Sequence, residues 1–256
     1  MRWRSTIFSC CLIFLMLVTA GAELAHGITL YDGSLGTPNA QGWTYIPDNG
    51  TFPFPPASVT MAASSGGTIL QTLTPNTDRA GFFRTDIGQN RNSGYTLRFN
   101  LRIDADDVNL GNNDRAGFSV IALSSDLQGI ELAFWDDRIF AQSDSPLFTH
   151  AEESLLNTGL LREYLLTIQG GSYSLTWTGA STPLSGALRN YSAHSNAVYS
   201  TPNFLFLGDN TTSAGADIFL GSVEFQAIPE PKTWALGILL LLGVGAVKMR
   251  RPILAT

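Results

Sequence analysis

The sequence predicts an all-β fold, an antiparallel sandwich preceded by a signal helix and followed by a short transmembrane helix. The main observation is that apolar and polar side chains alternate strictly over residues 95–103, as in a strand with one buried face. Other β-like segments are short and separated by turn residues roughly every 8–15 positions. An uncharged apolar run lies near each end of the chain, at residues 7–18 and 234–247.

These runs divide the 256 residues into three parts. Residues 1–27 have the composition of a secretory signal peptide, with two arginines before the apolar run and small residues suited to cleavage at Ala20–Ala22 or at Ala25–Gly27. A retained signal anchor is the alternative. Residues 28–226 form the predicted domain, and residues 227–256 form a separate tail. Both cysteines lie in the signal, so the exported chain is expected to have neither a disulfide nor a thiolate.

The predicted domain is acidic. Residues 28–228 contain nine arginines, no lysine and nineteen carboxylates, which gives a net charge of −10. A surface of this sign repels nucleic acids and anionic lipids, so no nucleic-acid partner is expected. It is compatible with neutral glycans and with cations.

In the first half of the domain, residues 28–31 are expected to form an edge strand, and two further strands flank the turn at Ser65–Gly67. Four prolines between Pro47 and Pro56 predict a loop, because proline has no backbone N–H to donate. A polar stretch at residues 104–114 predicts a second loop, directly after the alternating strand.

The second half predicts strands with one exception. The expected strands are residues 116–123, 129–135, 138–142, 163–169, 172–178, 204–207 and 218–225. Residues 136–137 predict a turn, and the glycines at 170–171 predict the tight turn of a hairpin. The exception is residues 151–161, where Thr149 and Glu152 match a capping box and predict a short helix.

Few residues suggest catalysis. Glycoside hydrolysis needs two carboxylates about 5–9.5 Å apart, and Glu131 and Asp137 are the pair that a shared strand face would bring together. We favour the other interpretation, in which Glu131 is a solvated strand residue and Asp137 belongs to a turn. His150 and His194 are accompanied by no Gly-x-Ser-x-Gly motif and no zinc-ligand spacing, so the domain is expected to be non-catalytic.

Calcium is the candidate cofactor, because it binds the oxygen ligands that Asp and Asn supply. One candidate site combines Asp209, Asn210 and Asp217. The other is the polar loop, with Asp104, Asp106, Asp107, Asn109, Asn112, Asn113 and Asp114. The alternatives are side-chain bonding to the turn backbone for the first group and a flexible acidic loop for the second.

Three tryptophans are candidates for stacking on sugar rings. Trp177 alternates with Tyr173 and Leu175 and is therefore expected in the core. Trp43 lies in a region rich in glycine and proline, where we expect exposure, so it is the first choice for a ligand-binding residue. Trp135 is the remaining candidate.

The tail combines three features in a fixed order. Pro229, Glu230 and Pro231 come first, the apolar run follows, and Lys248, Arg250 and Arg251 form a basic cluster at its end. As a helix, the run would extend about 21 Å at ~1.5 Å per residue, short of the roughly 30 Å hydrocarbon core. A buried core helix is the alternative, which the terminal position and the flanking motifs disfavour.

This tail resembles the PEP-CTERM sorting signal of Gram-negative bacteria, although residues 252–256 continue past the basic cluster, where that family usually stops. The resemblance implies recognition by an exosortase, a membrane transpeptidase-like protease. It also implies transient anchoring in the membrane through the apolar run. After removal of the tail, the protein would reach the cell surface or the extracellular space.

Residues 28–225 resemble bacterial choice-of-anchor surface domains and concanavalin-like (laminin G-like) jelly rolls. Tyr31–Gly36 and the closing stretch from Phe204 to Asp217 carry this resemblance, which implies a jelly-roll-like sandwich. We therefore expect a non-catalytic surface or matrix protein that contacts extracellular polysaccharide. The alternative is a glycan-active hydrolase or lyase on the same fold. Purely structural packing in a matrix is a third reading, which the sequence does not separate from the first.

Overall fold

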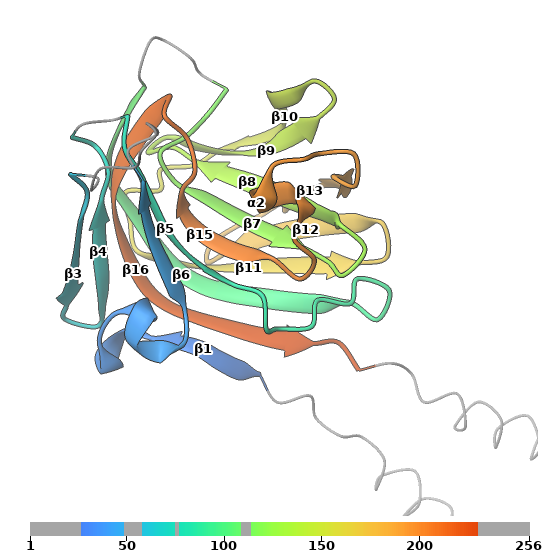
Figure 1. Cartoon of the computed structure of the whole chain (residues 1–256), viewed down its shortest axis with the longest axis horizontal. Helices are drawn as coiled ribbons and strands as arrows, with labels where there is room; N and C mark the ends of the chain where they lie inside the picture. Colours follow the sequence, from blue (N-terminus) through green and yellow to red (C-terminus); the bar gives the residue numbers. More distant parts are fainter. Residues whose placement is uncertain (1–26, 49–57, 75–76, 109–113, 230–256) are drawn as a thin grey trace, which may run out of the picture. The chain divides into compact units, whose positions relative to one another are not determined.

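A computed structural model describes residues 27–48, 58–74, 77–108 and 114–229. Within these residues the strands form two eight-stranded antiparallel sheets that pack face to face (Figure 1). The predicted all-β antiparallel sandwich is therefore confirmed. The predicted signal and transmembrane helices lie outside the described residues, among which no helix is long and apolar enough to cross a membrane.

The two sheets are called A and B. Sheet A has the order β13 (Leu184–Ala187), β12 (Ser172–Trp177), β11 (Arg162–Gln169), β6 (Tyr95–Val108), β16 (Ala214–Ala227), β4 (Gly67–Gln71) and β3 (Thr60–Ser64), with β1 (Ile28–Asp32) paired to β16. Sheet B has the order β10 (Leu147–Leu155), β9 (Arg138–Asp144), β8 (Gln128–Phe134), β7 (Ser119–Leu123), β15 (Leu205–Asp209), β5 (Arg79–Arg84) and β2 (Thr44–Asp48), with β14 (Arg189–Asn190) paired to β8. Short helices at Gly33–Leu35, Pro38–Gln41 and Ala197–Ser200 (α2) complete the described elements.

The main core lies between the sheets. The alternate residues of β6 all point into it, as their pattern predicted: Tyr95, Leu97, Phe99, Leu101 and Ile103, each at most 1% exposed. Phe99 stacks on Tyr164 of β11, and Phe134 of β8 meets both rings edge-on. Burial of each large apolar side chain contributes about 1.5–3 kcal/mol. Among the described residues, the members of this core lie between Leu30 and Phe225.

The longest strands run side by side at the centre of sheet A. β16, drawn in orange-red in Figure 1, pairs with β6 from Ala214↔Val108 to Ala227↔Tyr95. Two register shifts interrupt this ladder, after Asp217 and after Leu220. Such bulges bend a strand and increase its twist, and β16 also pairs with β4 and β1.

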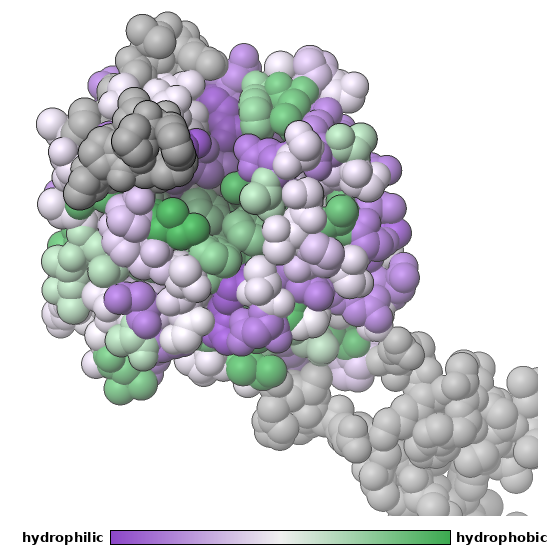
Figure 2. Space-filling model, in the orientation of Figure 1, coloured by the Kyte–Doolittle hydropathy of each residue, from purple (hydrophilic) through white to green (hydrophobic). Residues whose placement is uncertain are grey.

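Sheet B is covered on both faces. Every residue of β7 is buried: Val120 and Ala122 face the main core, whereas Ile121 and Leu123 belong to a second cluster on the opposite, outer face. Residues 191–203, here called the strap, supply Tyr191, Val198 and Tyr199 to that cluster and include α2. Figure 2 shows apolar side chains gathered in the middle of the face viewed, with hydrophilic ones around them.

The helix predicted for residues 151–161 is wrong. Residues 147–155 form β10, which pairs with β9, and exposure alternates along its second half. The Thr149 hydroxyl donates to the carbonyl of Pro146 and caps no helix. Pairing along the edge of sheet B therefore prevails over the local capping signal, which is only a weak preference.

Both predicted loops begin as strands. β6 continues to Val108, so residues 105–108 pair with the start of β16. Pro47 lies within β2, the edge strand of sheet B, where a missing N–H costs no ladder bond on the open side. Residues 49–57 and 109–113, the remainder of these two predictions, lie outside the described residues.

Candidate functional site

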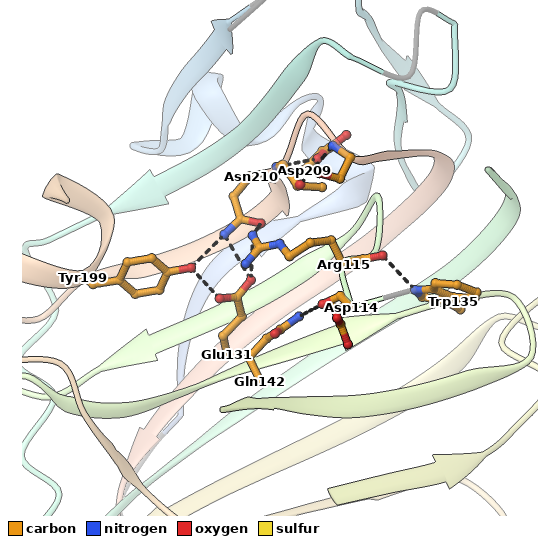
Figure 3. A network of polar contacts seen from close by, with 10 residues as sticks. Asp114, Arg115, Glu131, Trp135, Gln142, Tyr199, Asp209 and Asn210 are labelled. Carbon is orange, nitrogen blue, oxygen red and sulfur yellow. Dashed lines mark hydrogen bonds and ion pairs between the residues drawn. The ribbon is translucent and has the colours of Figure 1, made fainter. Parts of the chain in front are cut away.

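A polar cluster lies on the outer face of sheet B, and it is the candidate site (Figure 3). It consists of Arg115, Glu131, Tyr199 and Asn210, here called the outer-face cluster. Glu131 projects from the middle of β8, Arg115 precedes β7, Asn210 follows β15, and Tyr199 comes from α2. Four segments distant in sequence thus meet at one point.

Glu131 is the hub of the outer-face cluster. Its carboxylate accepts hydrogen bonds from the Tyr199 hydroxyl at 2.5 Å and from Asn210 Nδ2 at 3.0 Å. Arg115 Nη2 lies 3.3 Å from the same carboxylate and donates to Asn210 Oδ1 at 2.7 Å. The side chains of Arg115 and Glu131 are only 6% and 1% exposed, whereas Asn210 is partly exposed.

The strand pattern explains why Glu131 faces outward. Its neighbours Ile130 and Leu132 both point into the main core, so the residue between them must point to the other face. Tyr199 reaches Glu131 because Asn196 caps α2, accepting from the N–H of Val198 at 3.0 Å.

Arg115 is held by a contact of its side chain with an aromatic ring and by a hydrogen bond to its backbone carbonyl. Its guanidinium lies 4.1 Å above the centre of the Phe148 ring, a geometry that favours a cation. Phe148 adopts φ 64°, a strained value for a bulky residue, and such strain often accompanies binding and catalytic sites. The carbonyl of Arg115 accepts from Trp135 Nε1 at 3.1 Å, and that of Asp114 accepts from Gln142 Nε2 at 2.7 Å.

The electrostatics of the cluster are balanced. Burial opposes the charge of Arg115, but Glu131, Tyr199 and Asp209 together outweigh this, and the pKa of Arg115 is raised. Burial, and next the charge of Glu131, raise the pKa of Tyr199 well above 10, so this phenol stays protonated. Arg115 Nη1 is buried and has no hydrogen-bond partner among the described residues.

The three calcium candidates do not share a centre. Asp209 is buried, and its Oδ1 accepts from the N–H of Thr211 at 2.9 Å, the turn bonding that we weighed as the alternative. Asn210 belongs to the outer-face cluster, whereas Asp217 accepts from Gln71 Nε2 in sheet A. Burial raises the pKa of Asp209 well above its usual range. Within the described ranges, no group of three or more His, Cys, Asp or Glu is arranged to hold a metal.

The second calcium candidate is divided by the strand. Asp104 pairs with Arg102, and Asp106 lies at the end of β6 near Asp136. The carbonyl of Asp114 is occupied by Gln142. Asn109, Asn112 and Asn113 lie outside the described residues, so calcium binding there stays a prediction.

The expected exposure of Trp43 is wrong. Its side chain is buried in the main core, and its Nε1 donates to the carbonyl of Leu30 at 2.8 Å. The glycine-rich and proline-rich surroundings form the short helix at Pro38–Gln41, after which the chain turns inward. Trp177 packs against the core as predicted. Trp135 is half-buried, with Arg138 5.6 Å above its ring.

Glu131 and Asp137 have different surroundings. Asp137 lies in the β8–β9 turn, as predicted, and binds Arg138. The prediction that Glu131 is solvated is wrong, because the strap covers it. His150 lies 3.3 Å from Glu153 and stacks on Phe140, and His194 packs beside Tyr191.

Of the outer-face cluster, sequence reasoning considered Glu131 and Asn210 in other roles and missed Arg115 and Tyr199. One signal was present: Glu131 is a single carboxylate within an otherwise apolar strand. A buried carboxylate requires a cationic or hydrogen-bonding partner. Of the predicted sorting residues, Pro229 is exposed, and Glu230, Pro231, Lys248, Arg250 and Arg251 lie outside the described residues.

Comparison with known proteins gives a fold likeness. No family model and no curated protein matches the sequence. A carbohydrate esterase from the Shiga toxin-encoding bacteriophage phi24B is 12% identical with TM-score 0.52, over 80% of this chain and 100% of that one. A protein of unknown function with a galectin-like fold from Bacillus subtilis is 7% identical with TM-score 0.50, over 78% and 96%. The domain thus has the architecture of galectin-like, jelly-roll sandwiches.

Proposed function

We propose that this chain is an exported, non-catalytic surface or matrix protein that binds extracellular polysaccharide at the outer-face cluster. The signal-like N-terminus and the PEP-CTERM-like tail support export and sorting by an exosortase. The jelly-roll architecture, which resembles that of a carbohydrate esterase, is compatible with a glycan as ligand.

One observation carries the proposal. A guanidinium, a carboxylate, an amide and a phenol converge on the outer face of sheet B, and aromatic residues surround them. Ligand sites typically combine an apolar, aromatic lining with a few placed polar groups. Such groups pair with the hydroxyls of a sugar, and aromatic rings contact its C–H faces.

The same geometry favours binding over catalysis. A hydrolase needs two carboxylates that face the sugar. The other nearby carboxyl is that of Asp209, which lies opposite the core residue Ala80 in the β5–β15 pair and therefore faces the main core. A lyase needs a base, but the raised pKa keeps Tyr199 protonated. Glu131 is engaged by three partners rather than directed at open space.

The alternative is a glycan-active hydrolase or lyase on this fold. Incubation of the domain with the producing organism's own polysaccharide distinguishes the two. We expect no release of reducing or unsaturated sugar. Release that Glu131→Gln abolishes would establish the enzymatic alternative.

The experiment that tests binding uses residues 27–229 and the same polysaccharide, measured with calcium and with chelator. We expect saturable binding that Asn210→Ala weakens about two- to tenfold, since a lost hydrogen bond between neutral groups is worth ~0.5–1.5 kcal/mol. Asn92→Ala is the control, because this exposed asparagine lies in the loop before β6. Absence of binding in both conditions would refute the proposal, and loss in chelator alone would indicate a calcium ion.

A further inference from the structure

We infer that the outer-face cluster takes a neutral glycan through its hydroxyl groups and excludes polyanionic glycans. This inference rests on the proposed function and specifies its ligand class. Three observations support it: the charge balance of the cluster, the pairing of the arginines over the domain, and the hydroxyl that the cluster already holds.

The cationic member of the cluster is already neutralised. Arg115 Nη2 lies 3.3 Å from Glu131, and both side chains are almost fully buried. Charges interact strongly in such a poorly solvated place. A uronate or sulfate brought to Arg115 would therefore also meet Glu131, whose repulsion offsets the attraction.

The remainder of the domain offers no compensating positive patch. Seven of its nine arginines form ion pairs with carboxylates, among the described residues: Arg84, Arg91, Arg98, Arg102, Arg115, Arg138 and Arg189. Arg162 donates to the carbonyl of Thr178. The net charge of residues 28–228 is −10. Polyanions are normally bound along unneutralised lysines and arginines, so this surface repels them.

The cluster already binds an uncharged hydroxyl. The Tyr199 oxygen lies 2.5 Å from Glu131 Oε2 and 3.4 Å from Asn210 Nδ2, donating to the first and accepting from the second. A sugar hydroxyl is the same chemical group with the same two capacities. Asn210 is the partly exposed member of the cluster, so a glycan hydroxyl would approach at its amide, beside the Tyr199 oxygen.

The test compares polysaccharides that differ only in charge. Residues 27–229 are titrated with dextran and dextran sulfate, with a neutral cellulose-type glucan and its carboxymethyl derivative, and with the organism's own polysaccharide. Each neutral polymer that binds the domain should do so with at least tenfold higher affinity than its charged derivative. We also expect less than a twofold change in affinity between low and high salt, because binding of an uncharged ligand is not screened.

Equal or tighter binding of the charged derivatives would overturn the inference while leaving the proposed function intact. Failure to bind any polymer, including the organism's own, would refute the proposed function itself. The wild-type comparison is therefore decisive even if every variant fails to fold.

A variant reverses the selectivity. Glu131→Gln keeps an acceptor for Tyr199 but leaves the charge of Arg115 uncompensated, so the preference should shift at least tenfold toward the carboxymethyl glucan. Glu163→Gln is the matched control, because this exposed glutamate pairs with Arg98 in sheet A. A shift of equal size in both variants would show that net charge alone governs selectivity and would overturn the assignment to this cluster.

Discussion

At the scale of single residues, Glu131 shows how much one position can organise. Its carboxylate gathers a guanidinium, an amide and a phenol from three other segments. An ionised group is buried at a large cost unless partners surround it. The contacts around Glu131 therefore stabilise the strap on sheet B as well as forming the candidate site.

The two stacked tyrosines of the strap give a matched test of this view. Tyr199 and Tyr191 stack with ring centres 5.0 Å apart, but only the Tyr199 hydroxyl bonds Glu131, whereas the buried Tyr191 hydroxyl has no partner among the described residues. We predict that Tyr199→Phe lowers the free energy of unfolding by about 1–3 kcal/mol. Tyr191→Phe should be neutral or slightly stabilising. Urea denaturation measures both, and equal losses would contradict the role given to Glu131.

The residue scale is also where prediction from sequence failed most. Strand alternation placed the five apolar residues of β6 correctly, because that rule needs only local spacing. Trp43 was misplaced because its burial depends on Leu30, which lies outside any local pattern. Arg115 and Tyr199 were missed for the same reason: the four members of the cluster lie 11 to 95 positions apart in the sequence.

At the scale of elements, the end of β6 and the β8–β9 turn form an acidic contact between the sheets. Burial, and next the charge of Asp136, raise the pKa of Asp106 to about 6, with Asp137 and Asp107 adding to the repulsion. As the pH rises, the unfolded chain therefore loses the carboxyl proton of Asp106 at a lower pH than the folded chain does. Stability contributed by protonated Asp106 is present below about pH 3.8 and is lost as the pH rises through about 6.

We predict that Asp106→Asn removes this loss. The variant should exceed the wild type in free energy of unfolding by about 1 kcal/mol at pH 7.5, since roughly two pKa units correspond to ~2.7 kcal/mol before solvent screening reduces it. The advantage should disappear near pH 4. Asp104→Asn is the control, because Asp104 is exposed and pairs with Arg102. An advantage that does not change between the two pH values would rule out the titration of Asp106 as its cause.

The pairing of β5 with β15 depends on a pair of glycines. Gly81 lies opposite Gly208, and a Cβ on Gly81 would stand 2.4 Å from the Phe206 ring. That ring belongs to the second cluster on the outer face. We predict that Gly81→Ala lowers the free energy of unfolding by about 1–3 kcal/mol through overpacking.

Gly88→Ala is the matched control for Gly81, because nothing lies within 4 Å of its added Cβ. It should change stability by less than about 0.5 kcal/mol, as measured by thermal and urea denaturation. Similar losses at both positions would mean that backbone freedom, and not the approach of Phe206, explains the requirement at Gly81.

Element types were predicted better than their ends. The central strands follow from alternation. In contrast, β10 was predicted to be a helix because its capping box is a local signal, whereas its strand conformation depends on pairing with β9. β6 was ended too early because Asp and Asn indicate loops in isolation. Its continuation depends on β16, more than a hundred positions later.

At the scale of the whole molecule, residues 26–228 form one compact unit. Its described core residues lie between Leu30 and Phe225, and β16 ends at Ala227. Ile228 still bonds the carbonyl of Gly94 at 2.9 Å, and Pro229 is exposed. The Pro-Glu-Pro motif therefore begins two residues after the end of β16.

This arrangement yields a prediction for export. In a Gram-negative host with an exosortase, the wild-type chain should lose its tail and leave the membrane fraction. Replacing residues 229–231 by three alanines should leave the tail attached and the chain in that fraction, as measured by intact mass and fractionation. The urea unfolding of the domain should stay within about 0.5 kcal/mol of the wild type, since no core contact changes.

Deletion of residues 252–256 is the matched control, because these residues follow the basic cluster and contribute nothing to the three-part motif. This variant should be processed like the wild type. If the alanine variant were released with the same mass as the wild type, the tail would not be acting as the sorting signal. If instead the deletion alone blocked release, recognition would extend past Arg251, and the departure of this tail from the usual pattern would be functional.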